Sequence, residues 1–383
     1  MAGVADLPLH SGHVPPWLFS IMKRMARAIV KLVVLELGEV HLLRRLSNPL
    51  WFQAFNNAIG MDWDSSGSTT VTAAILREVL AEENLGVWAV GGKGSRSLDV
   101  PKDLEKLSEV GAISYNLYEE LVKVSKLAAK ADTALLQDGF SLYHHMLLFN
   151  EKSNWVVIQQ GMNPSEKMAR RYHLSWEKAD PADITIEPHT GAVCEKVVEP
   201  LNLTDRRSQR SRKVVLDLAQ ENPSHISKHI RVVNAIIKGY KPLFGDLPRP
   251  IKPNIAYYRP VNLTSRMLKI LNEVYESRPA NFIELLLRTK VGPETIRALS
   301  LISELIYREP PPLNDVVVVY SPFKYAYVIG GKDGIPYPVK RELAEEVIRE
   351  LYDIIKASEL KHEEKVRAFR SLAKFAPPDI LPI

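Results

Sequence analysis

Residues 134–160 read ALLQDGFSLYHHMLLFNEKSNWVVIQQ and decide the class of fold. Two apolar runs of strand length flank the polar segment 150–154, and this pattern predicts two strands joined by a turn. The run WVVI at 155–158 gives the clearest strand signal, because aromatic and β-branched side chains pack well on a pleated sheet. We therefore expect a β-sheet in this region.

Apolar residues at helical spacing predict helices before and between the strands of this sheet. The expected helices lie at 17–33, 42–55, 71–82 and 114–130. Further strands are expected at 87–90 and 184–187. Strands mixed with helices predict an N-terminal domain of the α/β or α+β class, with a mixed sheet, over residues 1–245.

A proline-rich stretch at 242–260 predicts a linker or a constrained loop. Beyond it, the apolar pattern is helical as far as Phe375, apart from breaks at 310–312 and 330–338. We therefore divide the chain near residue 245 and predict an all-α C-terminal domain over 246–383.

The composition excludes several classes of protein. The chain has 383 residues with 46% hydrophobic and 25% charged residues, values typical of a globular protein. Its only cysteine, Cys194, excludes a disulfide scaffold and a four-cysteine zinc site. Residues 1–6 lack the features of a secretory signal, and apolar runs are too short to span a membrane. The expected location is the cytoplasm, without a membrane partner, and the sequence leaves a homo-oligomer open.

The net charge of +5 is concentrated in one window of the sequence. Between Asp205 and Lys241, nine basic residues face three acidic ones, which gives this window +6 and the rest of the chain −1. Such a concentration is typical of a surface that binds a polyanion, and the alternative is an ordinary solvated helix face. The candidate nucleic-acid-binding residues in this window are Arg206, Arg207, Arg210, Arg212 and Lys213.

Residues 285–299, LLLRTKVGPETIRAL, resemble a helix-hairpin-helix element. Gly292 would let a phosphate approach the backbone N–H groups that begin the second helix. Arg288, Lys290 and Arg297 add positive charge for contacts that position nucleic acid without reading its sequence. The alternative is a plain corner between two helices.

Base-excision glycosylases also contain such a hairpin, and their resemblance to this chain stops at the catalytic positions. In those enzymes a catalytic Lys or other residue occupies the second helix, whereas Glu294 stands at the matching position here. The later segment Pro338-Val339-Lys340 has a lysine where those enzymes carry an aspartate. Both positions speak against the glycosylase mechanism.

Four acidic residues are candidate ligands for Mg²⁺ or Mn²⁺, because metal-assisted phosphodiester cleavage needs carboxylates at strand ends. Asp62 and Asp64 lie two apart in a predicted strand, so their side chains would share one face. Asp138 and Glu187 complete the set. The alternative is that these acids cap helices and form ion pairs.

Further candidate catalytic residues surround Asp138 in the sequence. His144 and His145 alternate across a strand, so at most one of them would face a site. Gln160 would orient a substrate, and Arg170 and Arg171 would hold its backbone phosphates through bidentate contacts.

Six segments together resemble an archaeal and bacterial family known as domain of unknown function number 763. They are GVADLPLH at 3–10, RRLS at 44–47, LQDGFSLYHH at 136–145, QQGMN at 159–163, ARRYH at 169–173 and GGKDG at 330–334. They span nearly the whole chain, so the resemblance implies a shared full-length architecture. It implies no activity.

Three functional hypotheses follow from the residues. The leading one is a DNA nuclease dependent on Mg²⁺ or Mn²⁺, acting in repair or processing, with DNA a better fit than RNA. The second is a non-catalytic DNA- or RNA-binding module. The third is a base-excision glycosylase with atypical catalytic residues.

Overall fold

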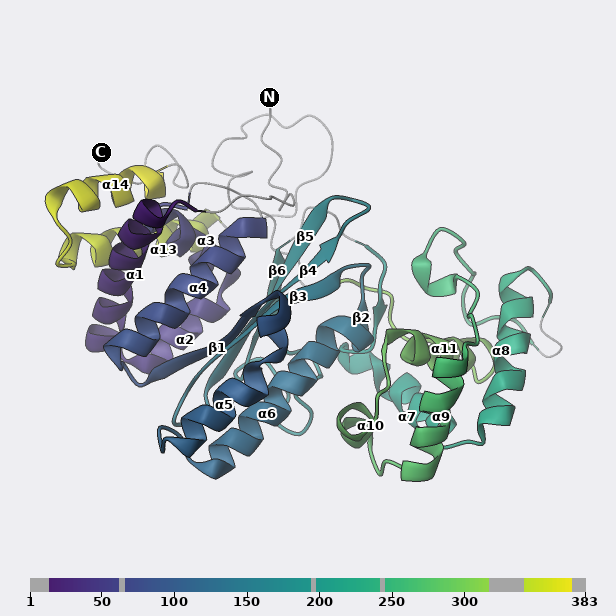
Figure 1. Ribbon diagram of the computed structural model, residues 1–383. Helices are drawn as coiled ribbons and strands as arrows, with labels where there is room; N and C mark the ends of the chain where they lie inside the picture. Colours follow the sequence, from purple (N-terminus) through teal and green to yellow (C-terminus); the bar gives the residue numbers. More distant parts are fainter. Residues whose placement is uncertain (1–13, 62–65, 194–197, 242–244, 317–340, 374–383) are drawn as a thin grey trace, which may run out of the picture.

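A computed structural model describes residues 14–61, 66–193, 198–241, 245–316 and 341–373 (Figure 1). The central element is a five-stranded sheet with the strand order β1-β3-β4-β5-β6. Its strands are β1 (Val87–Lys93), β3 (Ser141–Asn150), β4 (Trp155–Asn163), β5 (Met168–Ser175) and β6 (His189–Val193). Every neighbouring pair is antiparallel, so the predicted mixed sheet is wrong and the fold is of the α+β type.

The predicted turn between the two central strands is confirmed. Asn150 Oδ1 accepts hydrogen bonds of 3.1 Å from the backbone N–H groups of Lys152 and Asn154. Ser153 adopts a left-handed conformation with φ of 60°, which reverses the chain. The turn fixes the register in which Phe149 faces Trp155 and His144 faces Gln160.

The expected strand at 184–187 is absent from the described structure. These residues form turns instead, and Glu187 has a left-handed φ of 47° that ends any extended run. The strand lies just beyond them, as β6. The sequence prediction also missed β5, which pairs with both β4 and β6.

Helices cover both faces of the sheet (Figure 1). One face packs against α1 (Pro16–Leu37), α2 (Glu39–Ser47), α3 (Pro49–Ala58) and α4 (Ser66–Glu83). The other face packs against α5 (Val100–Glu109) and α6 (Tyr115–Lys130). The expected helices at 17–33, 71–82 and 114–130 are confirmed, whereas the one at 42–55 is divided between α2 and α3 at Asn48.

A π-helical turn, Ala131–Leu135, prolongs α6 and leads into the short strand β2 (Leu136–Gln137). β2 pairs with β7 (Leu201–Asn202) and joins the sheet to a separate group of helices. That group consists of α7 (Gln209–Ala219), α8 (Pro223–Ile237), α9 (Ser265–Ser277), α10 (Phe282–Arg288) and α11 (Pro293–Leu305). These five helices share one hydrophobic core, and we call residues 201–316 the helical lobe.

The last two described helices return to the other side of the molecule (Figure 1). α13 (Arg341–Ala357) and α14 (His362–Ala373) join the same core as α1, α3 and α4. We call the sheet with α1–α6, α13 and α14 the sheet lobe. The hydrophobic cores therefore divide the chain differently from the predicted boundary near 245, because α7 and α8 belong with α9–α11.

We expect Leu351→Ala to lower the free energy of unfolding by about 2–5 kcal/mol, the usual cost of truncating a buried leucine. Leu351 on α13 is fully buried in the core of the sheet lobe. Leu98→Ala is the control, because Leu98 is 80% exposed. Urea unfolding of the full chain measures both, and equal stability of the two variants would contradict the packing of α13.

Candidate functional site

Arg170 on β5 forms the most deeply buried ion pairs of the described structure. Its Nη1 donates a 2.6 Å hydrogen bond to Asp138, and its Nη2 donates one of 2.7 Å to Asp315. The hydroxyl of Tyr172, two residues along the same strand, also donates to Asp138 at 2.6 Å. Burial opposes the charge of Arg170, but Asp138 and Asp315 outweigh it and raise the pKa of the guanidinium above its usual value.

This arrangement gives Asp138 and Arg170 a structural role. Each oxygen of the Asp138 carboxylate already accepts a hydrogen bond from the protein, and the side chain is 1% exposed. Arg170 is equally buried, so it offers no surface on which to hold a nucleic-acid backbone. The predicted roles of Asp138 as a metal ligand and Arg170 as a phosphate clamp are corrected accordingly.

The predicted metal ligands are not brought together among the described residues. Glu187 lies half exposed beside Arg206, with 3.5 Å between the charged atoms. Asp62 and Asp64 lie outside the described residues. Within the described ranges, no group of three His, Cys, Asp or Glu side chains could hold a metal ion.

A row of polar side chains crosses the face of the sheet that packs on α1–α4. Lys93 on β1 is opposite His144 on β3, His144 is opposite Gln160 on β4, and Gln160 is opposite Arg171 on β5. Side chains directly opposite one another in antiparallel strands share a face. We call these four residues the polar row. It brings three of the predicted catalytic residues together and adds Lys93.

The row lies against the first turn of α4. Gln160 Nε2 donates to the carbonyl of Ser66 at 3.1 Å and to the hydroxyl of Tyr143 at 2.5 Å. Arg171 donates to Gln53 Oε1 at 3.0 Å and to Thr69 Oγ1 at 3.4 Å. Ser66 and Thr69 are on α4 and Gln53 is on α3, so these bonds join both helices to the sheet.

His144 is buried with both ring nitrogens lacking a hydrogen-bond partner. Burial, followed by the neighbouring His145 ring and the positive charges of Lys93 and Arg77, lowers the pKa of His144 to about 3. The ring is therefore neutral at physiological pH and carries one donor and one acceptor nitrogen.

His145 belongs to a different network on the opposite face of the sheet. Its ring bonds Ser125 at 2.9 Å and Gln159 at 2.8 Å. Gln159 continues to Asp132 at 2.5 Å, and Asp132 contacts His189 at 2.6 Å. The sequence prediction included only His145 from this set. The missed signal was the polar Gln159 inside an otherwise apolar strand.

The predicted hairpin corresponds to α10 and α11, which are joined by residues 289–292. Lys130 at the end of α6 donates to the carbonyl of Val291, and Gln137 donates to the carbonyl of Pro293 at 2.8 Å. These bonds fix the connection against the sheet lobe. A Cβ at Gly292 would meet no atom within 4 Å, so open space surrounds this backbone.

The basic candidates fall into three groups by exposure and pairing. Arg210, Lys213 and Lys290 are exposed and have no ion-pair partner among the described residues. Arg206, Arg207 and Arg288 are exposed but paired with acids. Arg212 and Arg297 are buried.

The two buried arginines serve the fold. Arg212 pairs with Asp183 at 2.6 Å and lies over the ring of Phe282 at 4.2 Å. Arg297 donates to two backbone carbonyls and pairs with Glu294 at 2.8 Å. Their predicted contact with nucleic acid is corrected, because neither guanidinium reaches the surface.

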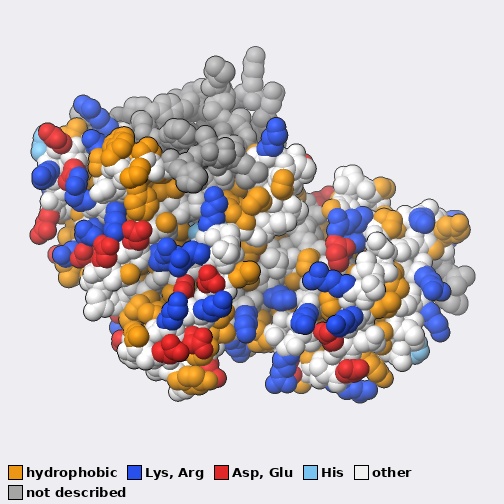
Figure 2. All heavy atoms as spheres, in the orientation of Figure 1, with side chains coloured by type: hydrophobic (Ala, Val, Ile, Leu, Met, Phe, Trp, Pro, Cys, Tyr) orange, Lys and Arg blue, Asp and Glu red, His pale blue; other side chains and the backbone are white. Residues whose placement is uncertain are grey.

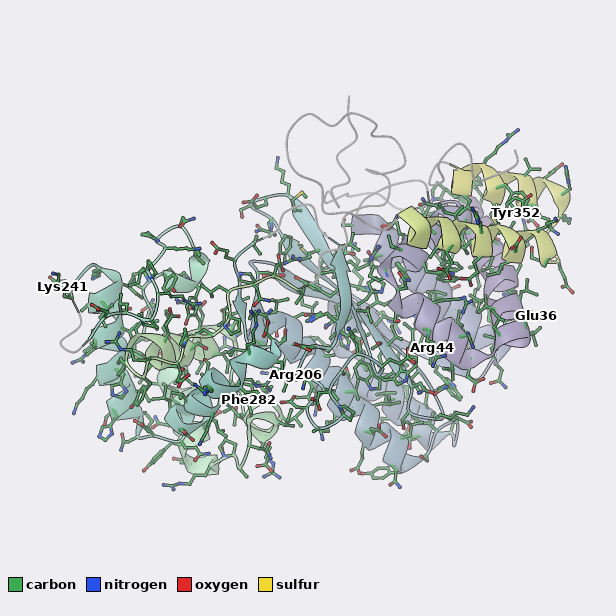
Figure 3. All side chains as sticks on the ribbon, turned by 180° about the vertical axis from the view of Figure 1, so that it is seen from behind. Glu36, Arg44, Arg206, Lys241, Phe282 and Tyr352 are labelled. Carbon is green, nitrogen blue, oxygen red and sulfur yellow. The ribbon has the colours of Figure 1, made fainter. Side chains whose placement is uncertain are left out.

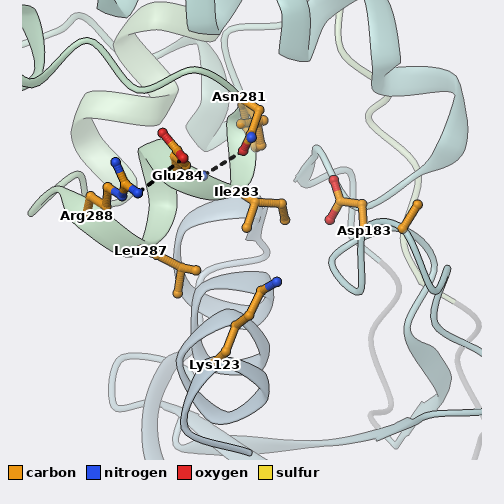
Figure 4. Close-up of a pocket in the computed structure, with 9 residues that line it drawn as sticks. Lys123, Asp183, Asn281, Ile283, Glu284, Leu287 and Arg288 are labelled. Atoms are coloured by element: carbon orange, nitrogen blue, oxygen red, sulfur yellow. Dashed lines mark hydrogen bonds and ion pairs between the residues drawn. The ribbon is translucent and has the colours of Figure 1, made fainter. Parts of the chain in front are cut away.

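A groove of about 690 Å³ separates α6 from α10 (Figure 4). Lys123 rises into it from α6, Arg288 and Leu287 line it from α10, and Asp183 lies across from them. A second hollow of about 260 Å³ adjoins it beyond Asn281 and includes Lys213. Both hollows meet at the first residues of α10.

Basic side chains gather on the face where α6 meets the helical lobe (Figure 2). The basic window of the sequence does not form one continuous patch, however. Arg206 and Phe282 lie near the junction of the two lobes, whereas Lys241 lies at the outer end of the helical lobe (Figure 3). Only the first part of the window, on α7, adjoins the grooves.

A family model described as a protein of unknown function, DUF763, matches residues 3–339. The chain belongs to this family. The matched range includes the sheet, the polar row and the α10–α11 connection. No curated protein and no solved structure matches the chain. No helix in the described ranges is long and apolar enough to cross a bilayer.

Arg170→Met should lower the free energy of unfolding by about 3–5 kcal/mol, because it leaves two buried carboxylates without their partner. Arg206→Met is the matched control. Arg206 pairs with Asp180 at 3.2 Å but is 55% exposed, so its removal should cost less than about 1 kcal/mol. Urea unfolding measures both, and a small effect at Arg170 would contradict its structural role.

The stability of the protein should fall as the pH drops below about 6.5, where unfolded histidines become protonated. Burial lowers the pKa of His144, His145 and His173, so the folded chain does not take up these protons. His144→Gln should reduce the loss between pH 7.5 and pH 4.5 by roughly 2 kcal/mol. His225→Gln, at an exposed site, is the control. Equal losses of stability in both variants would contradict the conclusion that His144 is buried without charge.

Proposed function

We propose that this protein binds the phosphodiester backbone of nucleic acid, preferably DNA, through the surface formed by α6, α7, α10 and α11. The observation that carries the proposal is the open Gly292 between α10 and α11, next to unpaired cations. Backbone N–H groups at the beginning of a helix are a favourable place for a phosphate oxygen. α11 has thirteen residues, and Pro293 as its first residue lacks an N–H and leaves Gly292 as the nearest donor before it.

The charges around this surface support an anionic partner. Lys123, Lys213 and Lys290 have no acidic partner among the described residues, and they come from three different elements. The acids lining the two grooves are neutralised, because Asp183 pairs with Arg212 and Glu284 with Arg288. The surface thus carries a net positive charge at separate points, as a backbone-binding surface requires.

Glu294 in the first turn of α11 does not cancel this charge. Its carboxylate pairs with Arg259 and, at 2.8 Å, with Arg297. These two arginines hold it against the fold. The same pairing gives no support to a glycosylase, because the position that would carry the catalytic lysine holds a neutralised acid. Nuclease activity stays a prediction of the sequence, since the described residues supply no carboxylate set for a metal.

Gly292→Ala tests the proposal without disturbing the fold. Gly292 has φ of −125°, which any residue adopts, and its Cβ would stand in open space. A phosphate that approaches this backbone would meet the new methyl group. We expect Kd for duplex DNA, measured by fluorescence anisotropy, to rise roughly fivefold, which corresponds to the loss of about 1 kcal/mol.

Lys213→Gln and Lys290→Gln should each weaken binding and reduce the slope of log K against log salt by about one. Lys102→Gln removes the same charge from α5, where the side chain is 76% exposed, and serves as the control. The same measurements with RNA in place of DNA determine which nucleic acid the protein prefers. Binding that is lost in Lys102→Gln but unchanged in Gly292→Ala and Lys290→Gln would overturn the proposal.

A further inference from the structure

The polar row carries more unsatisfied hydrogen-bonding groups than a structural core requires. Both ring nitrogens of His144 and the Oε1 of Gln160 are buried without partners. A buried polar group without a hydrogen bond destabilises the folded state. Three such atoms on facing residues of two strands point to a missing ligand.

The side chain of Gln160 is directed toward the first turn of α4. It is fully buried, and its Nε2 reaches the carbonyl of Ser66, the first residue of that helix. The hydroxyl of Tyr143 meets the same nitrogen from β3. The unpartnered Oε1 is therefore held in place at the junction of α4 with the sheet. A group bound there would contact the sheet and the helix together.

Two positively charged side chains, Lys93 and Arg77, act on His144. After burial and the neighbouring His145 ring, they lower its pKa. Arg171 adds a buried guanidinium at the other end of the row. Lys93 is exposed and has no acidic partner among the described residues, and Tyr143 is half-buried. The row therefore reaches solvent at its Lys93 end.

The backbone near Lys93 allows β1 to approach β3 closely. Gly91 has φ of +92°, and a Cβ there would lie 2.4 Å from the carbonyl oxygen of His145. Gly94 also has a left-handed φ, of +63°. Gly91 thus lets β1 approach β3 closely, two residues before Lys93 pairs with His144.

We propose that the polar row is a binding site for a phosphate group, with Lys93 and Arg171 supplying the charge and His144 and Gln160 the hydrogen bonds. A protonated phosphate oxygen donates to Gln160 Oε1, and the His144 N–H donates to another oxygen. A nucleic-acid end and free phosphate share this chemistry, and the experiment below distinguishes them. This site lies in the sheet lobe and does not depend on the backbone-binding surface of the proposed function.

Histidine side-chain NMR of the full chain, titrated with inorganic phosphate at constant ionic strength, tests this site. The His144 ring signals are identified by their loss in His144→Gln. We expect phosphate to shift these signals and to raise the unfolding temperature. Lys93→Gln should weaken both effects, whereas Lys102→Gln should leave them unchanged. Oligonucleotides with and without a 5′-phosphate form parallel arms, and a response to the phosphorylated one alone identifies a nucleic-acid end as the source.

Gln160→Glu tests whether the site binds an anion or a cation, because glutamate has nearly the same shape as glutamine but carries a negative charge. A carboxylate in the row should abolish the phosphate response. If Mg²⁺ instead shifts the His144 signals, and more strongly in Gln160→Glu, the phosphate assignment is overturned in favour of a metal. An unchanged His144 signal with every probe also overturns it. Gly292→Ala should leave the response to phosphate unchanged. A failure of the phosphate site can therefore be distinguished from a failure of the proposed nucleic-acid binding.

Discussion

The buried guanidinium of Arg170 connects three parts of the chain that lie far apart in the sequence. It joins β5 to Asp138, before β3, and to Asp315, on the segment leaving the helical lobe. Asp315 in turn accepts a hydrogen bond from the N–H of Val198 at 3.0 Å. Charges this deeply buried are tolerated only when paired, so this contact constrains how the helical lobe attaches to the sheet.

The two proposed binding regions lie in different parts of the molecule. On one face of the sheet, the polar row lies beneath the first turn of α4. Beside the sheet, Lys130 and Gln137 hold the connection between α10 and α11 against the end of α6. The two regions therefore share no residue and can be tested separately.

The sequence predicted the elements with a clear periodicity and missed those whose pattern is mixed. The apolar strand at 155–158 and the turn before it are as expected. β5 was missed because Arg170 and Arg171 are charged, although both are buried, one on each face of the strand. The same ambiguity misassigned Arg170, Arg212 and Arg297, since sequence alone does not distinguish a surface arginine from a buried one with an acidic partner. The sequence placed all six candidate catalytic residues in one site. In the structure, His144, Gln160 and Arg171 share one face of the sheet, whereas His145 and Arg170 lie on the other.

Hydrogen exchange of the full chain with and without duplex DNA tests the central claim most directly, because it locates the bound surface. The account predicts slower exchange at the start of α11 and in α7, with no change in α1, α13 or α14. Protection confined to α1, α13 and α14, or no protection at DNA concentrations that saturate binding by anisotropy, would contradict it.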